Sequence, residues 1–301
     1  MPWTKCWPMA ETLCVVGVGL IGGSFALAAR QAGLFRRVVG VDADADNLAQ
    51  ALEAGVIDSA YADPAESAAE ADLVLLATPV GAFEALFRAL RPTWTAQRIY
   101  TDAGSTKGSV IDAARRAFGS VPANFIPGHP IAGAEKSGVT AADAALFRRK
   151  RVILTPMEET DPAAVERVAT LWRALGAEVT AMSPERHDRL LAGTSHLPHV
   201  AAFALTHLLG REDESEDIFR YAAGGFRDFT RIASSDPVVW RDICLANREA
   251  IVARIEDLRG ELADIAGLIE RGDGAALQEI FAGANAARQR FLELFENNQH
   301  A

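Results

Sequence analysis

His129 is the residue whose type and surroundings most strongly suggest proton transfer. It stands between Gly128 and Pro130, in a loop expected at the ligand-binding edge of a sheet. A histidine in such a loop is not a typical core histidine, and proton transfer is the commonest use of its imidazole. Ser105 and Lys107 lie in a second small, polar turn after another expected strand. That turn is either a ligand contact or an ordinary helix cap.

Two further segments carry side chains that could bind a ligand. His196 and His199 are three residues apart on one expected helical face, which suits a metal, a substrate contact or a structural role. No cysteine or carboxylate stands at a telling spacing from them, so we expect no metal. In segment 224–231, arginines beside a double glycine suggest capture of a carboxylate by a two-pronged guanidinium group. Ion pairing on a helix surface is the alternative, and the segment alone favours it.

The glycine-rich stretch that begins at Gly17 is expected to bind a dinucleotide. It reads G-x-G-x-x-G, follows the apolar run 13–16 and opens a helix of small residues. That context provides a tight turn, close approach of the backbone to a pyrophosphate, and free N–H groups at the helix start. Asp42 ends the next strand, twenty residues after Gly22, where a carboxylate would bind the adenosine ribose. The alternative is a glycine turn that only lets a helix pack closely on a strand.

Short apolar runs alternate with helical patterns over the first 182 residues. Expected strands cover residues 13–16, 38–42, 72–77, 98–102, 151–156 and 178–182. This alternation predicts an α/β fold with a Rossmann-type, doubly wound parallel sheet. The third of these strands stops where the sheet should meet its ligand. The expected cofactor-binding residues are Gly17, Gly19, Leu20, Ile21, Gly22, Asp42, Thr78 and Pro79.

The pattern changes at Ser183, a serine N-cap followed by proline at the first helical position. No further strand is expected, so we predict a dinucleotide-binding domain at 1–182 and an all-α domain at 183–301. Residues 197–209 are apolar nearly all round, and a helix of that kind must be buried on every side. A second copy of the chain would bury it most simply, so we expect a homodimer. Gly210 should end this helix, an acidic surface loop should follow at 212–217, and residues 1–10 should form a loose leader.

Composition and charge narrow the classes of partner. The chain has 301 residues, and its net charge of −10 argues against a general nucleic-acid binder and against an anionic membrane surface. Three widely spaced cysteines indicate reduced thiols in a cytoplasmic protein. The uncharged run 13–29 contains four glycines and is shorter than the ~20 residues of a spanning helix. We therefore expect no membrane segment.

Together these segments resemble the prephenate/arogenate (cyclohexadienyl) dehydrogenases of tyrosine biosynthesis. The resemblance rests on G-V-G-L-I-G-G-S at 17–24, D-A-G-S-T-K-G at 102–108, G-H-P-I-A-G and E-K-S-G within 128–138, H-L-P-H at 196–199 and G-F-R-D-F-T-R at 225–231. The first motif is common to many dehydrogenases, whereas the His-Pro loop and the Phe-Thr-Arg segment are much more specific.

The resemblance implies an NAD(P)-binding domain, a helical dimerisation domain and oxidative decarboxylation of a cyclohexadienyl substrate. It implies that His129 polarises or deprotonates the substrate hydroxyl, that Ser105 hydrogen-bonds nearby, and that Arg231 holds a carboxylate. It also implies a pocket lined by His199, Glu135 and Trp240. No segment resembles an appended chorismate mutase or regulatory domain, so none is expected.

The specificity of such an enzyme is open to prediction. No arginine follows Asp42 to receive a 2′-phosphate, so NAD should be preferred over NADP. Glu135 is the expected contact for the ammonium group of arogenate, with prephenate as the first substrate. Two other functions stay open. One is a different hydroxy-acid or imine dehydrogenase with a Rossmann domain and a helical dimer, which would not need the His-Pro loop. The other is a non-catalytic NAD(H)-sensing module, in which His129 and Arg231 would have no purpose.

Overall fold

The computed structural model describes residues 10–134, 136–212 and 217–300. The chain divides into two compact units, Met1–Arg248 and Glu249–Ala301. The expected leader, most of the expected acidic loop and the side chain of Glu135 lie outside the described residues.

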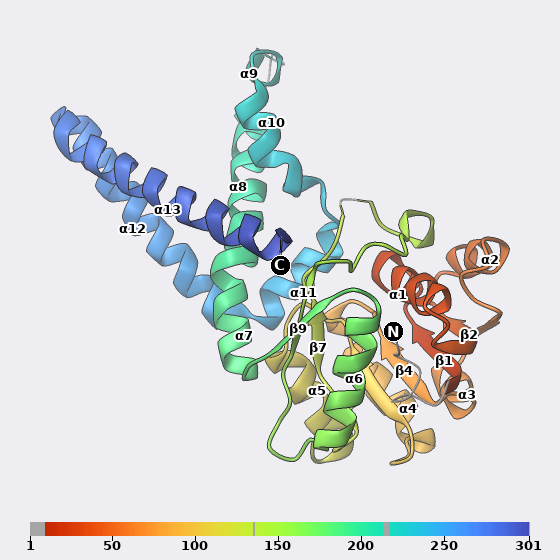
Figure 1. Cartoon of the computed structure of the whole chain (residues 1–301). Helices are drawn as coiled ribbons and strands as arrows, with labels where there is room; N and C mark the ends of the chain where they lie inside the picture. Colours follow the sequence, from red (N-terminus) through yellow and green to blue (C-terminus); the bar gives the residue numbers. More distant parts are fainter. Residues whose placement is uncertain (1–9, 135, 213–216, 301) are drawn as a thin grey trace. The chain divides into compact units, whose positions relative to one another are not determined.

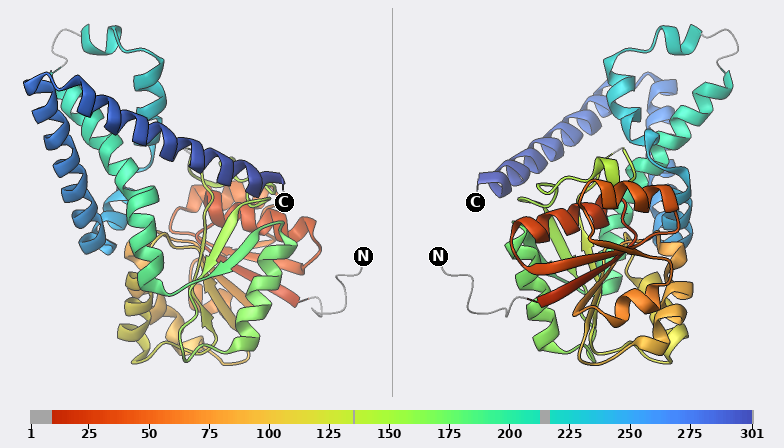
Figure 2. Two further views of the ribbon diagram at one scale, coloured as in Figure 1. Left: turned by 60° about the vertical axis from the view of Figure 1, so that its left-hand side comes forward. Right: turned by 90° about the vertical axis from the view of Figure 1, so that its right-hand side faces the viewer.

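A six-stranded parallel sheet forms the centre of the first unit (Figures 1 and 2). Its strand order is β3-β2-β1-β4-β5-β6, the order of a doubly wound dinucleotide-binding fold. The expected α/β fold class is therefore confirmed. The strands are β1 (Ala10–Val16), β2 (Phe35–Val41), β3 (Ser59–Tyr61), β4 (Leu73–Leu76), β5 (Ile99–Asp102) and β6 (Phe125–Ile126).

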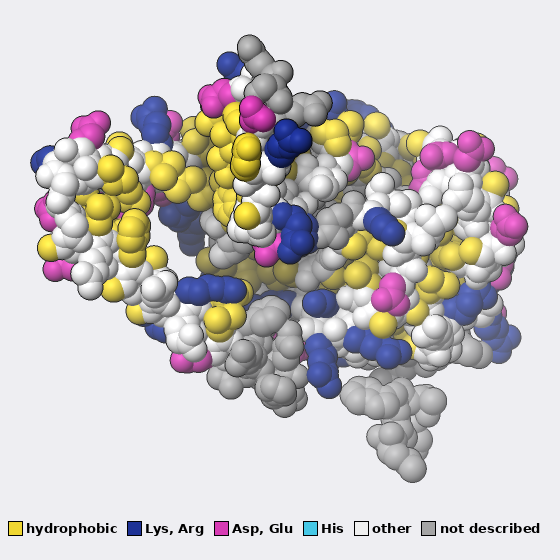
Figure 3. Space-filling model, turned by 90° about the horizontal axis from the view of Figure 1, so that it is seen from above, with side chains coloured by type: hydrophobic (Ala, Val, Ile, Leu, Met, Phe, Trp, Pro, Cys, Tyr) yellow, Lys and Arg dark blue, Asp and Glu magenta, His cyan; other side chains and the backbone are white. Residues whose placement is uncertain are grey.

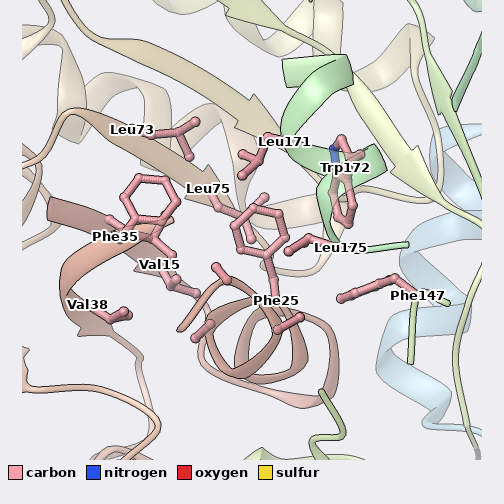
Figure 4. Close-up of a cluster of buried hydrophobic side chains, with 14 of the residues drawn as sticks. Val15, Phe25, Phe35, Val38, Leu73, Leu75, Phe147, Leu171, Trp172 and Leu175 are labelled. Carbon is pink, nitrogen blue, oxygen red and sulfur yellow. The ribbon is translucent and has the colours of Figure 1, made fainter. Parts of the chain in front are cut away.

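Both faces of this sheet are buried under helices, and successive side chains of each strand point into opposite cores. In β1, Leu13 and Val15 enter one hydrophobic core, whereas Cys14 and Val16 enter the other. The first core is shared with α1 (Leu20–Gln31), α2 (Ala45–Glu53) and α6 (Pro162–Ala174). The second is shared with α3 (Pro64–Ala69), α4 (Phe83–Leu90) and α5 (Gly108–Phe118). Figure 4 shows the first core, where the rings of Phe25 and Trp172 meet edge to face with centroids 4.8 Å apart.

The last three strands form a separate sheet, which differs from the single parallel sheet expected from the sequence. It contains β7 (Gly128–Pro130), β8 (Arg151–Leu154) and β9 (Glu178–Ala181), and β7 runs antiparallel to β8. Pro127 stands between β6 and β7, and proline has no N–H to continue the first ladder. The second sheet places His129 opposite Ile153 in the pairing register.

The described secondary-structure elements after Ser183 are helices and helical turns. The side chain of Ser183 accepts a hydrogen bond from the Arg186 N–H, which confirms the expected N-cap. Gly210 does not end α8, because glycine fits within the helix and two more residues follow it. The elements of this part are α7 (Pro184–Leu191), the π-helical turn η5 (Ala192–His196), α8 (Leu197–Glu212), α9 (Asp217–Arg220), α10 (Gly224–Thr230), the 3₁₀ turn η6 (Arg231–Ser234) and α11 (Pro237–Ala246).

The second unit consists of two long helices, and three short 3₁₀ turns complete the first. The long helices are α12 (Arg248–Arg271) and α13 (Gly274–His300), and the turns are η2 (Val80–Ala82), η3 (Arg91–Thr93) and η4 (Val139–Ala141). No described helix combines the length and hydropathy needed to cross a membrane.

Large apolar side chains remain exposed on the helical elements, and Figure 3 shows hydrophobic groups gathered at the surface there. In α8 only Ala202 is buried. Exposed in the first unit are Leu52, Leu190, Leu208, Phe219, Tyr221, Phe229, Val238 and Leu245, and in the second Val252, Leu262, Ile269, Phe281, Phe291 and Leu294.

Candidate active site

The glycine turn after β1 is shaped for close approach of a ligand to the backbone. Gly17 has φ of 91°, and a Cβ there would lie 2.6 Å from the carbonyl oxygen of Ala77. A Cβ at Gly22 would overlap the Gly17 carbonyl, so the third glycine lets α1 pack on the turn. Gly19 has no neighbour within 4 Å of its Cβ position and caps α1 without a side-chain hydrogen bond. The turn and the free N–H groups of α1 therefore fit a pyrophosphate.

Asp42 is held at the end of β2 by three donors. Its Oδ2 accepts from the Val18 N–H at 2.8 Å and from the Asn47 side-chain amide at 3.1 Å, and its Oδ1 accepts from the Asp44 N–H at 3.0 Å. A carboxylate fixed beside the glycine turn suits the ribose hydroxyls of NAD. Thr78, after β4, contributes a buried hydroxyl that has no hydrogen-bond partner among the described residues. These features fit NAD, with Pro79 leading into η2.

A buried ion pair joins the turn after β5 to β7. The Lys107 ammonium donates to Asp102 and, at 2.6 Å, to the carbonyl oxygen of Gly128. Asp102 also accepts from the N–H of Gly128 at 2.9 Å. Both charged side chains are fully buried. The turn that carries Ser105 and the strand that carries His129 are thus fixed to each other, so Lys107 has a structural role that the sequence had left open.

His129 is the first member of a hydrogen-bonded chain that reaches into α7. Its Nδ1 lies 2.9 Å from Nε2 of His187, and Nδ1 of His187 lies 2.7 Å from Oδ1 of Asp188. Asp188 in turn accepts from the N–H groups of Lys107 and Gly108, each at 2.8 Å. The backbone at the start of α5 therefore fixes Asp188, the last member of this hydrogen-bonded series.

The direction of these hydrogen bonds fixes the tautomer of His129. Burial opposes the charged form of Asp188, but hydrogen bonds from His187 and from the backbone at Lys107 and Gly108 outweigh it and lower the pKa of this carboxyl. The ionised carboxylate can only accept, so His187 donates from Nδ1 and accepts at Nε2. His129 must then donate from Nδ1, which leaves the lone pair of its Nε2 free to take a proton.

Burial also keeps His129 in the neutral form that a base needs. Loss of solvation, together with the charges of His187, Lys107 and His196, lowers the pKa of His129 well below its ordinary 6.5. Burial lowers the pKa of His187 as well, although the hydrogen bond to Asp188 works in the other direction. At neutral pH this hydrogen-bonded series therefore consists of the Asp188 carboxylate and the two uncharged imidazoles of His187 and His129.

A cavity of ≈ 590 Å³ opens beside His129, large enough for one six-membered ring with substituents. His199 stacks on Trp240 with ring centroids 3.7 Å apart, which forms one aromatic wall. Asp236 lines the cavity while its Oδ1 accepts from the N–H groups of Val238 and Val239 at the start of α11. The expected residues that line the cavity are Leu20, Ile21, Ser105, His129, His199, Arg231 and Trp240.

Sequence reasoning missed the residues that orient the base. His187 and Asp188 are adjacent on a short helix, and nothing in their spacing marks them as partners of a loop 58 residues earlier. His196, at the end of the π-helical turn η5, and His199, in α8, both line the cavity, and the rings of both lie near Trp240. Within residues 10–134, 136–212 and 217–300, no three His, Cys, Asp or Glu side chains are grouped to bind a metal ion.

Comparison with known proteins gives one consistent family. Residues 25–181 match the family model described as prephenate dehydrogenase, nucleotide-binding domain, and residues 183–283 match prephenate dehydrogenase, dimerization domain. Prephenate dehydrogenase of Bacillus subtilis is 39% identical over 93% of this chain and 76% of its own length. Cyclohexadienyl dehydrogenase of Zymomonas mobilis is 38% identical over 92% of this chain and 94% of its own length. The structure of Aquifex aeolicus prephenate dehydrogenase with hydroxyphenyl propionate and NAD+ has a TM-score of 0.88 and 36% identity, and covers 95% of this chain and 100% of that one.

Proposed function

Because this chain belongs to the prephenate dehydrogenase family, we propose that its cavity binds prephenate and that His129 acts as the base of the reaction. The chain is an NAD-dependent dehydrogenase. It catalyses oxidative decarboxylation of prephenate to 4-hydroxyphenylpyruvate. Acceptance of arogenate as a second substrate is part of the proposal.

One observation carries the assignment of His129. The hydrogen bonds from His129 through His187 to Asp188 leave Nε2 of His129 unprotonated. His129 also borders a cavity that includes Leu20 and Ile21 at the start of the cofactor-binding helix. A base and a dinucleotide site on one ring-sized cavity are what removal of a hydroxyl proton with transfer of a hydride requires.

NAD, when bound, supplies the acceptor for the hydride that leaves the hydroxyl-bearing ring carbon. His129 takes the hydroxyl proton at Nε2 while the C–O bond becomes a carbonyl. The carboxylate on the opposite ring carbon then leaves as carbon dioxide, and its bonding electrons complete the aromatic ring. Aromatisation drives this step, so the residues need only orient the ring and hold its charges.

Arg231 is proposed to hold a substrate carboxylate, since a guanidinium group can bind it through two parallel hydrogen bonds. Ser105 is proposed to hydrogen-bond near the hydroxyl, and His199 with Trp240 to support the ring. Glu135 remains a predicted contact for the ammonium of arogenate.

We also propose that the chain works as a homodimer in the cytoplasm. The matched dimerization domain and the exposed apolar side chains of residues 183–301 support the dimer. Sparse cysteines, of which Cys14 and Cys244 are free thiols, support the reducing compartment. Light scattering at micromolar concentration should give twice the chain mass of 32.2 kDa, and a uniform monomer would contradict the proposal.

A side-by-side assay tests the function. NADH formation should be fastest with prephenate, slower with arogenate and absent with a panel of simple hydroxy acids. Turnover of hydroxy acids alone would favour another dehydrogenase. Tight NADH binding without turnover of either cyclohexadienyl compound would favour a sensing module.

A further inference from the structure

One polar atom in the wall of the cavity has no partner. The side chain of His196, at the end of the π-helical turn η5, is 1% exposed and lines the cavity beside His129. Its Nε2 is buried and has no hydrogen-bond partner among the described residues. A buried polar group left without a partner destabilises the folded protein, so such an atom at a binding site points to a ligand.

The neighbours of His196 determine what this atom can do. The side-chain nitrogen of Asn247 donates to the carbonyl oxygen of Asp188 at 2.8 Å, which fixes the orientation of the amide. The second hydrogen of that nitrogen is directed to Nδ1 of His196 at 3.2 Å. Nδ1 is therefore the acceptor of the ring, and the proton of the neutral imidazole resides on Nε2. The unpartnered atom is a donor.

His196 stays neutral over the range in which a dehydrogenase works. Burial lowers the pKa of His196 to about 4, against some opposition from the charge of Asp188. A neutral imidazole can donate a hydrogen bond without bringing a full charge into the cavity. Such donors stabilise oxygen atoms on which negative charge develops.

His196 and His129 line the same cavity. His196 is near enough to His129 to contribute to the lowering of its pKa. The centroid of the His196 ring also lies 6.2 Å from that of the Trp240 ring. His196 is therefore a neighbour of both His129 and Trp240 in the wall of the cavity.

We propose that the Nε2–H of His196 donates a hydrogen bond to the substrate oxygen from which His129 removes the proton. The inference rests on the proposed function. As the O–H bond breaks, the proton moves to Nε2 of His129, the hydride moves to the nicotinamide, and the oxygen becomes a carbonyl. Two imidazoles of opposite polarity hold that oxygen: His129 accepts its proton, and His196 stabilises the charge that the oxygen carries on the way.

Two inhibitors that differ only in this oxygen test the proposal. 4-Hydroxyphenylpropionate carries the ring hydroxyl and 3-phenylpropionate lacks it. Their dissociation constants are measured by calorimetry with NAD present, for the wild-type chain, His196→Leu, His196→Gln and Val239→Ala. Val239 also lines the cavity and carries no donor, so it controls for changes in cavity shape.

The wild-type chain should prefer the hydroxylated inhibitor, and His196→Leu should reduce that preference about 5- to 20-fold, the usual effect of one buried hydrogen bond. His196→Gln should restore part of it because its amide can donate, and Val239→Ala should leave it unchanged. Turnover of prephenate should fall in His196→Leu with little change in KM. NAD affinity and melting temperature report whether each variant folds. If His196→Leu does not fold, the comparison is made with His196→Gln.

An unchanged preference in a folded His196→Leu or His196→Gln variant overturns the proposal. So does an equal loss of affinity for both inhibitors, because His196 would then contact another part of the ligand. Failure of the proposed function looks different. In that case the wild-type chain does not oxidise prephenate, whatever the ratio of the two dissociation constants.

Discussion

Residues 10–182 and residues 183–248 contribute to the same cavity, but they are built in different ways. The first region buries both faces of its sheet and holds its ligand-binding turns by backbone N–H groups that donate to the carboxylates of Asp42 and Asp102. The second presents several apolar side chains to solvent and contributes residues that act across long sequence distances, such as His187 on His129. The first region resembles a finished domain. The second region has apolar side chains that need a partner surface to cover them, so its sequence pattern alone says less about its role.

The largest expected effect tests the residue on which both regions act. His129→Asn keeps a hydrogen-bonding group but removes the base, so kcat should fall by about 10²–10⁴-fold. NAD affinity, measured by NADH fluorescence, should be nearly unchanged because the glycine turn is not altered. Near-normal turnover would leave His129 as a residue that only shapes the loop.

The same assay has a pH dependence with a defined sign. Only neutral His129 can accept the proton, and burial lowers its pKa below 6.5. Activity should therefore remain high as pH falls to 6.5 and decline only at lower pH. The decline should disappear from the residual activity of His129→Asn, and a decline centred above 6.5 would contradict the assignment.

Substitution of His187 tests how much the second region contributes to catalysis by orienting His129 in the first. His187→Leu removes the acceptor for Nδ1–H of His129, so the ring can adopt the wrong tautomer, and kcat should fall about 10²-fold. His187→Gln offers an oxygen as acceptor and should recover about tenfold of that loss. A purely structural role predicts equal losses in both variants together with a lower melting temperature.

His129 and His187 also show which parts of the site can be predicted from the sequence and which cannot. The fold class, the cofactor turn and the cavity residues Ser105, His129, Arg231 and Trp240 could be predicted because each stands in a local pattern: a glycine spacing, a strand end, or a motif with a distinctive composition. His187 and Asp188 could not, because their function depends on a contact between segments 58 residues apart. The second sheet was missed for a related reason. Its strand β7 is three residues long, and its antiparallel pairing depends on the chain turning back between β7 and β8.

Arg231 should separate binding from chemistry. Arg231→Ala removes a cation from the cavity wall, and hydrogen bonds to charged groups contribute about 1.5–3 kcal/mol. The KM for prephenate should rise about 10- to 100-fold, with a smaller change in kcat. Arg227→Ala, on the exposed helix α10, is the matched control and should have little effect, because its ion pair with Asp228 lies in solvent. Equal losses in the two variants would indicate a general electrostatic attraction rather than a specific carboxylate site.

The smallest expected effect is on cofactor preference, after substitution of Asp42, a residue predicted directly from the sequence. Asp42→Ser removes the charge that repels a 2′-phosphate, so the ratio of kcat/KM for NAD to that for NADP should fall by about tenfold. Part of this change will be a loss with NAD, because Asp42 accepts hydrogen bonds from Val18 and Asn47 and thereby orders the turn. Asp44→Ser is the control: it removes a charge two residues away but keeps a side chain able to cap α2. If both variants narrow the ratio equally, net charge selects NAD. If only Asp42→Ser does so, the carboxylate fixed by the turn selects it, and cofactor choice is set within the first region alone.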